Sequence, residues 1–318
     1  MKPLSEMKIL VTGGAGFVGS NLVERLVKDN ARVIVLDDLF SGKESNLPQS
    51  NFIEFVKGSV CNETLVTKLV NDVDMVFHLA ARNIIVSTKE PKEDFAVNIG
   101  GTLNILMAAR EKGPKVVYTS STSIYGNPKH LPIHEEDGIN PLSPYSTSKL
   151  AGESYCLAFY ETYGLPTAVV RYSNVYGIRQ SPLNTYCGAI SKFFEWVMRG
   201  ESPKIHGDGD QSRDFTFVSD AVEATLLAGI SPKSEGRAYN VSTGIETTIN
   251  ELVRRIIRIC GSSVEPVYVD RRDVDNIRRR VCNIERIRHE LRWIPKITLD
   301  RGLQLTRDWL AREPRGNT

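Results

Sequence analysis

The chain has 318 residues, of which 41% are apolar and 25% are charged, the composition of an ordinary globular protein. That length suits one large α/β unit, or a nucleotide-binding domain with a smaller second unit. The formal net charge of +2 gives no reason to expect nucleic acid or an anionic membrane as a partner. The five cysteines form no C-x-x-C pair, so we expect reduced thiols and neither a disulfide framework nor a metal site. A polar N-terminus and the lack of a long apolar run predict a cytoplasmic protein.

The first predicted element is a buried parallel strand over residues 8–12, which runs into a glycine-rich turn and then a helix over residues 21–30. In this context the pattern G-x-x-G-x-x-G is typical of a dinucleotide site. Gly13 permits the tight turn, Gly16 lets the backbone approach a pyrophosphate, and Gly19 allows the helix to pack closely on the strand. The helix N-terminus then offers free backbone amides to the phosphates.

Two acidic residues, Asp37 and Asp38, follow the second predicted strand, residues 32–36. An acid at this place, roughly 20 residues after the glycines, accepts a hydrogen bond from the adenosine ribose 2′-hydroxyl and repels a 2′-phosphate. The pattern therefore favours NAD over NADP as cofactor. Lys43 lies close by in the sequence, and we interpret it as a solvated loop residue.

Strands and helices continue to alternate as far as residue 170. The fourth strand contains His78, which we interpret as a buried structural histidine. Six strands alternating with helices predict a doubly wound parallel sheet of the Rossmann type. The remaining strands are predicted over residues 52–56, 73–79, 115–119 and 167–170, and the remaining helices over residues 61–70, 94–111 and 145–163.

Hydroxyl side chains, Ser120 and Ser121 among them, follow the fifth strand, where open α/β sheets bind ligands. Pro144 can begin the next helix, and Tyr145 and Lys149, four residues apart, then project from one face of it. A free phenol has a pKa of about 10 and is a poor base at neutral pH. We expect the lysine and a nearby positively charged nicotinamide to lower that pKa, so that the phenolate can deprotonate an alcohol as its hydride leaves.

Beyond residue 173 short strands and helices alternate, and a basic stretch, Arg278-Arg279-Arg280, lies near the C-terminus. Such a stretch is either a solvated face or, beside a nucleotide site, a clamp for phosphates. The sequence leaves both readings open.

With these motifs in this order, the chain resembles the extended short-chain dehydrogenase/reductase family, in its NAD-dependent nucleotide-sugar epimerase/dehydratase branch. The likeness extends from the glycine turn to the segments 291–295 and 299–310. It implies a Rossmann domain over residues 1–173, to which residues 214–240 return, and a smaller α/β domain for the nucleotide sugar over residues 174–318. It also implies a homodimer, paired through the predicted helices with apolar residues on more than one face.

By that resemblance Tyr145 is the catalytic base, Lys149 binds the nicotinamide ribose and Ser121 binds the reacting sugar hydroxyl. Asn174 and Arg213 match residues that contact the substrate diphosphate. The family's R-x-G-D motif is altered here, with Arg272 and Asp275 as its counterparts. The other substrate contacts implied are Arg82, Thr122 and Ser123. The cofactor contacts implied are Gly13, Gly16, Phe17, Val18, Gly19, Asp37, Asp38, Ser41, Gly42, Ser59, Val60, Leu79, Ala80, Ala81, Asn98, Ser120, Tyr145, Lys149 and Tyr172.

The residues after Ser121 separate the reactions of the branch. The 4,6-dehydratases carry an Asp-Glu pair where this chain has Thr122 and Ser123, because eliminating water needs an acid and a base. Uronate decarboxylases also carry Glu at the position of Ser123. Uronate 4-epimerases tend to have Thr in place of Asn174, and an Arg where this chain has Ser181.

The resemblance therefore implies a UDP-hexose 4-epimerase of the UDP-glucose/UDP-galactose type, which acts through a transient 4-keto sugar. The alternatives are a UDP-glucuronate 4-epimerase or decarboxylase, a 4,6-dehydratase or a reductase on the same frame. A more remote alternative is a non-catalytic NAD-binding sensor, since a fold does not fix a function. The sequence does not decide which sugar or which nucleotide base is bound.

Overall fold

The computed structural model describes residues 2–182, 184, 188–271 and 277–312. Its main feature is a seven-stranded sheet in which every neighbouring pair of strands is parallel. The strand order β10-β6-β5-β4-β1-β2-β3 reverses between β1 and β4, as in dinucleotide-binding sheets. Six of these strands were predicted, and the seventh, β10, comes from the C-terminal half. The strands are β1 (Lys8–Thr12), β2 (Arg32–Asp37), β3 (Ile53–Lys57), β4 (Met75–His78), β5 (Lys115–Ser121), β6 (Thr167–Tyr172) and β10 (Arg237–Val241).

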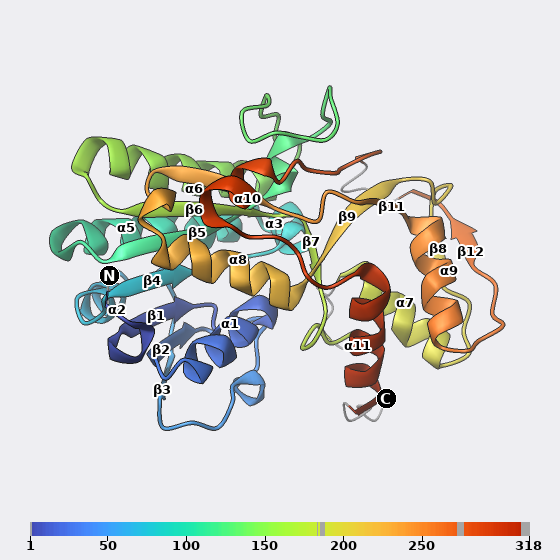
Figure 1. The fold of residues 1–318 in the computed structure, drawn as a ribbon, viewed down its shortest axis with the longest axis horizontal. Helices are drawn as coiled ribbons and strands as arrows, with labels where there is room; N and C mark the ends of the chain where they lie inside the picture. The colour runs from blue at the N-terminus through green and yellow to red at the C-terminus, as the bar shows by residue number, and fades with distance from the viewer. Residues whose placement is uncertain (1, 183, 185–187, 272–276, 313–318) are drawn as a thin grey trace.

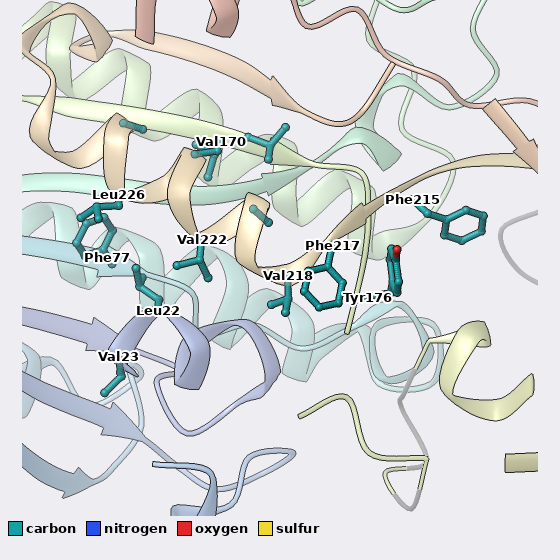
Figure 2. Packing of buried hydrophobic residues seen from close by; sticks show 14 of the residues in the cluster. Leu22, Val23, Phe77, Val170, Tyr176, Phe215, Phe217, Val218, Val222 and Leu226 are labelled. Carbon is teal, nitrogen blue, oxygen red and sulfur yellow. The ribbon is translucent and has the colours of Figure 1, made fainter. Parts of the chain in front are cut away.

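Helices cover both faces of this sheet, which explains why its strands are nearly continuous apolar runs. Because side chains alternate along a strand, Ile9 and Val11 pack with α1 and α8 on one face, whereas Leu10 packs toward α2, α5 and α6 on the other. Figure 1 shows α8 packed over the large sheet and running roughly along its strands, and Figure 2 shows Leu22 of α1 near the side chains of α8. These helices are α1 (Phe17–Lys28), α2 (Glu63–Val70), α5 (Gly101–Lys112), α6 (Pro144–Tyr163) and α8 (Val218–Ile230).

The long helix expected over residues 94–111 is divided into three parts. It begins as α4 (Pro91–Asp94), continues as a π-helix (Phe95–Gly100) and ends as α5. A short helix, α3 (Ile84–Lys89), precedes it. A π-helical turn inside a helix often marks a functional region, and this one carries the buried side chain of Asn98.

Most of the remaining elements form a second lobe at one end of the molecule (Figure 1), whereas α10 (Glu285–Leu291) packs against β10 of the large sheet. A three-stranded sheet of order β11-β9-β7 and a two-stranded sheet of β12 and β8 lie there with three helices. The strands of this lobe are β7 (Asn174–Tyr176), β8 (Lys204–His206), β9 (Ser212–Phe217), β11 (Glu246–Thr248) and β12 (Val267–Val269), and its helices are α7 (Ala189–Met198), α9 (Ile249–Ile259) and α11 (Leu299–Arg312).

An apolar cluster continues from the large sheet into this lobe. Tyr176 of β7 packs edge-on against Phe217 of β9, with 5.5 Å between ring centroids, and also against Phe215 (Figure 2). The same cluster contains Val218 and Val222 of α8, which covers the large sheet. The chain thus leaves the large sheet after β6 and returns to it through α8 and β10. The division into two domains stays a prediction. No helix in the described part of the chain has the length and apolar character that crossing a membrane requires.

Candidate active site and cofactor pocket

A cavity opens at the carboxyl ends of the central strands, beside the point where the strand order reverses. The glycine turn, the ends of β2, β4 and β5, and the first turns of α6 line it. Every residue predicted to contact NAD lies in this lining except Gly42 and Asn98. The lining also includes residues that the sequence did not single out, for which it carried no clear signal: Leu36, Gly58, Asn83, Val97, Thr119, Ser173, Val175, Gln180 and Gly188.

The glycine turn forms a cradle that side chains would fill. Gly13 has φ of +68°, and a Cβ atom there would lie 2.7 Å from the backbone nitrogen of Ala80. A Cβ atom on Gly19 would lie 2.1 Å from the carbonyl oxygen of Gly13. Gly16 is the N-cap of α1 and supplies no capping side chain, so the first amides of the helix can bind a phosphate. The residues present therefore fit the pyrophosphate of a dinucleotide.

Both acids at the end of β2 lie in the cavity lining. Asp37 accepts hydrogen bonds from the backbone nitrogens of Ala15 (2.9 Å) and Leu39 (2.8 Å), and burial raises the pKa of its carboxyl. Asp38 forms an ion pair with Arg82 at 2.8 Å. The acids thus fix the loop around the expected ribose site, and their contact with the ribose stays a prediction.

Arg82, predicted to contact the substrate, lies at the β2 end of the cavity. Its guanidinium is bound to Asp38 and also to Glu93 (2.7 Å), and it stacks over the ring of Phe40 at 3.9 Å. Neither ion pair could be predicted from the sequence, because Asp38 and Glu93 are 44 and 11 residues away from Arg82. Its position therefore suits a contact with the cofactor better than a contact with the sugar.

The structure brings Ser121, Tyr145 and Lys149 into one cavity. Ser121 is the last residue of β5, and its hydroxyl is hydrogen-bonded to the phenol of Tyr145. The start of α6 is fixed by a capping box between Ser143 and Ser146, so Tyr145 lies in the first turn of the helix. The Nζ atom of Lys149 lies 4.4 Å from the ring centroid of Tyr118.

The groups of the chain give no net lowering of the Tyr145 pKa, contrary to the expectation from the sequence. Burial raises the pKa of Tyr145 to about 12, and this outweighs the hydrogen bond from Ser121 and the positive charge of Arg280, which lower it. Burial also lowers the pKa of Lys149 to about 8, although Asp94 opposes this change. The cause is desolvation, which disfavours the charged form of both groups and which a helical spacing cannot reveal.

A buried hydrogen-bond network holds α6 in place. Ser148 donates to Asp94 (3.0 Å) and accepts a hydrogen bond from Asn98 (3.0 Å), and Asn98 also accepts one from the backbone nitrogen of Arg82 (2.7 Å). Asn98, predicted to contact NAD, is only 1% exposed and lies outside the cavity lining. In this structure it instead connects the Arg82 loop to α6.

Two serines near the end of β5 have no hydrogen-bond partner for their buried Oγ atoms within the described residues, Ser120 and Ser123. Buried hydroxyls normally have partners, so these atoms suit a bound ligand. Ser120 lies in the cavity lining, whereas Ser123 donates its backbone N–H to Ser121 (3.1 Å). Thr122 is buried and is not part of the lining.

The predicted diphosphate contacts are more scattered. The neighbours of Asn174 in the chain, Ser173 and Val175, line the cavity, whereas Asn174 does not. Arg213 is buried and donates to the backbone carbonyl of Ile277 at 2.8 Å. The predicted contacts Arg272 and Asp275 lie outside the described residues.

The basic stretch near the C-terminus has two parts. Arg278 is paired with Asp208 (2.7 Å) and Arg279 with Glu246 (2.6 Å), both on the exposed side. Arg280 is buried, 5% exposed, and its charge acts on Tyr145. The stretch is thus a solvated face at two positions and a neighbour of the site at the third. No group of His, Cys, Asp and Glu that could hold a metal ion occurs in the described ranges.

Comparison with known proteins agrees with this geometry. Residues 9–242, which include the glycine turn, Ser121, Tyr145 and Lys149, match the family described as NAD dependent epimerase/dehydratase family. The chain belongs to this family. The predicted Rossmann-type fold, the predicted family and NAD as the cofactor are therefore confirmed, and the protein is an enzyme of the nucleotide-sugar epimerase/dehydratase branch.

Relatives in the family share the full length of the chain. A UDP-glucose 4-epimerase of Mycolicibacterium smegmatis is 40% identical over 307 residues, covering 94% of this chain and 97% of that protein. A putative UDP-glucose 4-epimerase of Methanocaldococcus jannaschii is 39% identical, covering 96% and 99%. The crystal structure of UDP-glucose 4-epimerase from Thermotoga maritima with UDP-glucose has a TM-score of 0.92 at 37% identity, covering 96% of this chain and 99% of that one. Decarboxylases and 4,6-dehydratases of the same family also match, at 34% identity and below.

Proposed function

We propose that the chain is a UDP-hexose 4-epimerase, which interconverts UDP-glucose and UDP-galactose through a transient 4-keto sugar. The observation that carries the proposal is that Ser121, Tyr145 and Lys149 line one cavity, in which Ser121 acts on the phenol of Tyr145 and Lys149 lies one turn further along α6. The names of the two relatives at about 40% identity support the same reaction. The assignment of individual residues to cofactor and substrate is part of the proposal.

In this reaction the chain must first remove a proton from the 4-hydroxyl of the sugar. Tyr145 in its phenolate form accepts that proton, and Ser121 aligns the hydroxyl with it. Lys149, which lies in the same cavity, binds the ribose of the nicotinamide half of NAD. Bound NAD supplies reversible hydride exchange with carbon 4 of the sugar.

The lack of a carboxylate at the two positions after Ser121 favours epimerisation over elimination of water. Residues 122 and 123 are Thr and Ser, and the acids of the described cavity lining, Asp37 and Asp38, lie at the far end of β2. A 4,6-dehydratase needs an acid and a base beyond the tyrosine. An epimerase instead needs the 4-keto sugar to rotate within the site. The protein must therefore contact the sugar at few points while it binds the nucleotide firmly.

Proton NMR of the purified chain with UDP-glucose or UDP-galactose tests this proposal. We expect the opposite 4-epimer to appear from either sugar, without added NAD if the cofactor is retained through purification. Parallel samples with the N-acetyl sugars, UDP-glucuronate and dTDP-glucose define the sugar and base range. If both UDP-hexoses stay unchanged even with NAD supplied, the proposal is wrong. If UDP-glucuronate alone is converted, the substrate is a UDP-uronate and not a UDP-hexose.

A further inference from the structure

A buried ion pair joins Arg171 of β6 to Glu153 of α6, the helix that carries Tyr145. We propose that Arg171 and Glu153 are positioning residues, which hold Ser121 and Tyr145 within hydrogen-bonding distance of each other. Only 5% of the Arg171 side chain and 2% of the Glu153 side chain are exposed. This inference rests on the proposed function for the roles of Ser121 and Tyr145.

The guanidinium of Arg171 connects three separate segments. Its Nε donates to both carboxylate oxygens of Glu153 in α6, at 3.0 and 3.1 Å. One terminal nitrogen donates to the hydroxyl of Tyr125 at 2.5 Å and to the backbone carbonyl of Glu135 at 2.9 Å. Tyr125 ends a short 3-10 helix, Thr122–Tyr125, that begins directly after Ser121. Arg171 thus joins α6 to the segment that carries Ser121.

The spacing along α6 places this ion pair on the face of the catalytic side chains. Glu153 follows Lys149 by four residues and Tyr145 by eight, so the three project in similar directions. On the strand side, Arg171 of β6 is opposite Ser120 of β5, one residue before Ser121. The ion pair therefore fixes the helix relative to the end of β5 at the level of the active site.

The network continues to the segment that carries Arg280. The hydroxyl of Tyr125 donates to Asn240 of β10 (2.8 Å), and the Asn240 amide donates to the carbonyl of Ile133 (3.1 Å). Ile133 in turn accepts from Asn283 and donates to Val281, on either side of the buried Cys282. One network thereby aligns three segments that meet at Tyr145.

Energetics separate positioning from simple stabilisation. Burying two charges costs about as much free energy as their attraction returns, and a well-packed apolar pair of similar volume is often as stable. An apolar pair cannot, however, make the directional hydrogen bonds that join α6 to Tyr125 and to Glu135. The ion pair at this place is therefore better explained by alignment than by stability.

The double substitution Arg171→Met with Glu153→Leu tests this inference in the holoenzyme. We expect the melting temperature and the bound NAD to stay near wild type, whereas kcat on UDP-hexose falls by about tenfold to a hundredfold with little change in KM. Tyr125→Phe, which removes one hydroxyl and keeps the ring, should lower kcat less and leave the fold intact. If the double variant does not fold, Tyr125→Phe decides the question.

A matched control removes a buried cation from the other end of β5. Lys115 donates to the Ser231 carbonyl (2.6 Å) and to the Ser234 hydroxyl (2.8 Å), far along the strand from Ser121. Lys115→Met should leave kcat unchanged. Wild-type kcat in both Tyr125→Phe and the double variant, or a kcat loss matched by lost NAD and a lower melting temperature, would overturn the inference.

A wild-type chain that is inactive on every UDP-hexose would refute the proposed function and not the positioning. The pKa of Tyr145 then tests the positioning. It is measured from the tyrosinate absorbance as a function of pH, with the Tyr145→Phe chain as the blank. Asp94 from α4, Arg280 from the C-terminal segment and Ser121 from β5 all act on this phenol, and Lys149 lies one turn away. We expect its pKa to rise in the positioning variants as the Ser121 hydrogen bond is lost, and an unchanged pKa contradicts the inference.

Discussion

The hydroxyl of Ser121 is hydrogen-bonded to the phenol of Tyr145, across the junction between the end of β5 and the first turn of α6. This bond lowers the pKa of Tyr145, as does the charge of Arg280, whereas burial and the charge of Asp94 raise it. The basicity of the phenol is thus a balance of opposing effects, which single substitutions can move in either direction.

Tyr145→Phe should lower kcat by about 10²- to 10⁴-fold, the usual contribution of a positioned proton-transfer group. The bound NAD should remain, because the phenyl ring fills the same space. Epimer formation by NMR and the cofactor content of the denatured protein measure the two quantities. Tyr268→Phe, at an exposed tyrosine of β12, is the control. Near-normal turnover in the Tyr145 variant would show that Tyr145 is not the catalytic base.

Ser121→Ala should lower kcat/KM and move its pH dependence. The Ser121 hydrogen bond favours the phenolate, so its loss raises the pKa of Tyr145. Activity that needs the phenolate is lost as pH falls through this pKa, and the acidic limb of the profile should therefore shift to higher pH. Ser121→Thr keeps the hydroxyl and should retain the wild-type profile. An identical limb in the alanine variant would show that the bond does not act on Tyr145.

Asp94→Asn should move the same limb in the opposite direction. The carboxylate charge of Asp94 raises the pKa of Tyr145 and also that of Lys149, so its removal lowers both. An amide oxygen can still accept the hydrogen bond from Ser148, which preserves the contact with α6. The pH profile of kcat/KM measures the shift. A limb that moves to higher pH would contradict the sign of this coupling.

Asp38→Asn should weaken the preference for NAD over NADP. The substitution removes a negative charge that repels a 2′-phosphate, and it releases Arg82 from an ion pair of 2.8 Å. One charge-assisted hydrogen bond from Arg82 to the phosphate corresponds to about a tenfold gain for NADP. The ratio of the two dissociation constants, measured on cofactor-free protein, gives the result. Asp72→Asn, at an exposed residue paired with Lys8, should leave the ratio unchanged.

The expected homodimer can be tested at its predicted helices. Met107 of α5 and Tyr155 of α6 are 41% and 40% exposed, so both side chains are accessible to a second copy of the chain. Light scattering should give twice the 35.5 kDa mass of the chain, and Met107→Glu should shift it toward the monomer. Ile245→Glu, at an exposed apolar residue of the second lobe, should leave the mass unchanged. A monomeric wild type would contradict the dimer.

Local spacing was enough to predict the parts of the site that lie within one element or turn. Gly13, Gly16 and Gly19 follow a strand and begin a helix, and Tyr145 and Lys149 are separated by one helical turn. These patterns have a direct geometric meaning. They predict the cofactor cradle and the Tyr145 side of the cavity without reference to tertiary contacts.

Features that depend on distant contacts could not be predicted in this way. Arg82 is placed by Asp38, 44 residues away, and the buried pair of Arg171 and Glu153 joins two residues that are 18 positions apart. The pKa of Tyr145 depends on burial, which spacing does not report. For the same reason, the sequence alone does not predict that Arg280 is buried whereas Arg278 and Arg279 are exposed.

The return of β10 to the edge of the large sheet bears on how this enzyme can be divided or recombined. A fragment that ends before residue 237 would leave one side of β6 without its partner strand, and such an open edge invites aggregation. Exchanging the second lobe with that of another family member therefore requires joins after β6, around α8 and after β10 together. Truncation at a single boundary should yield insoluble protein, and a chimera built on all three joins should not.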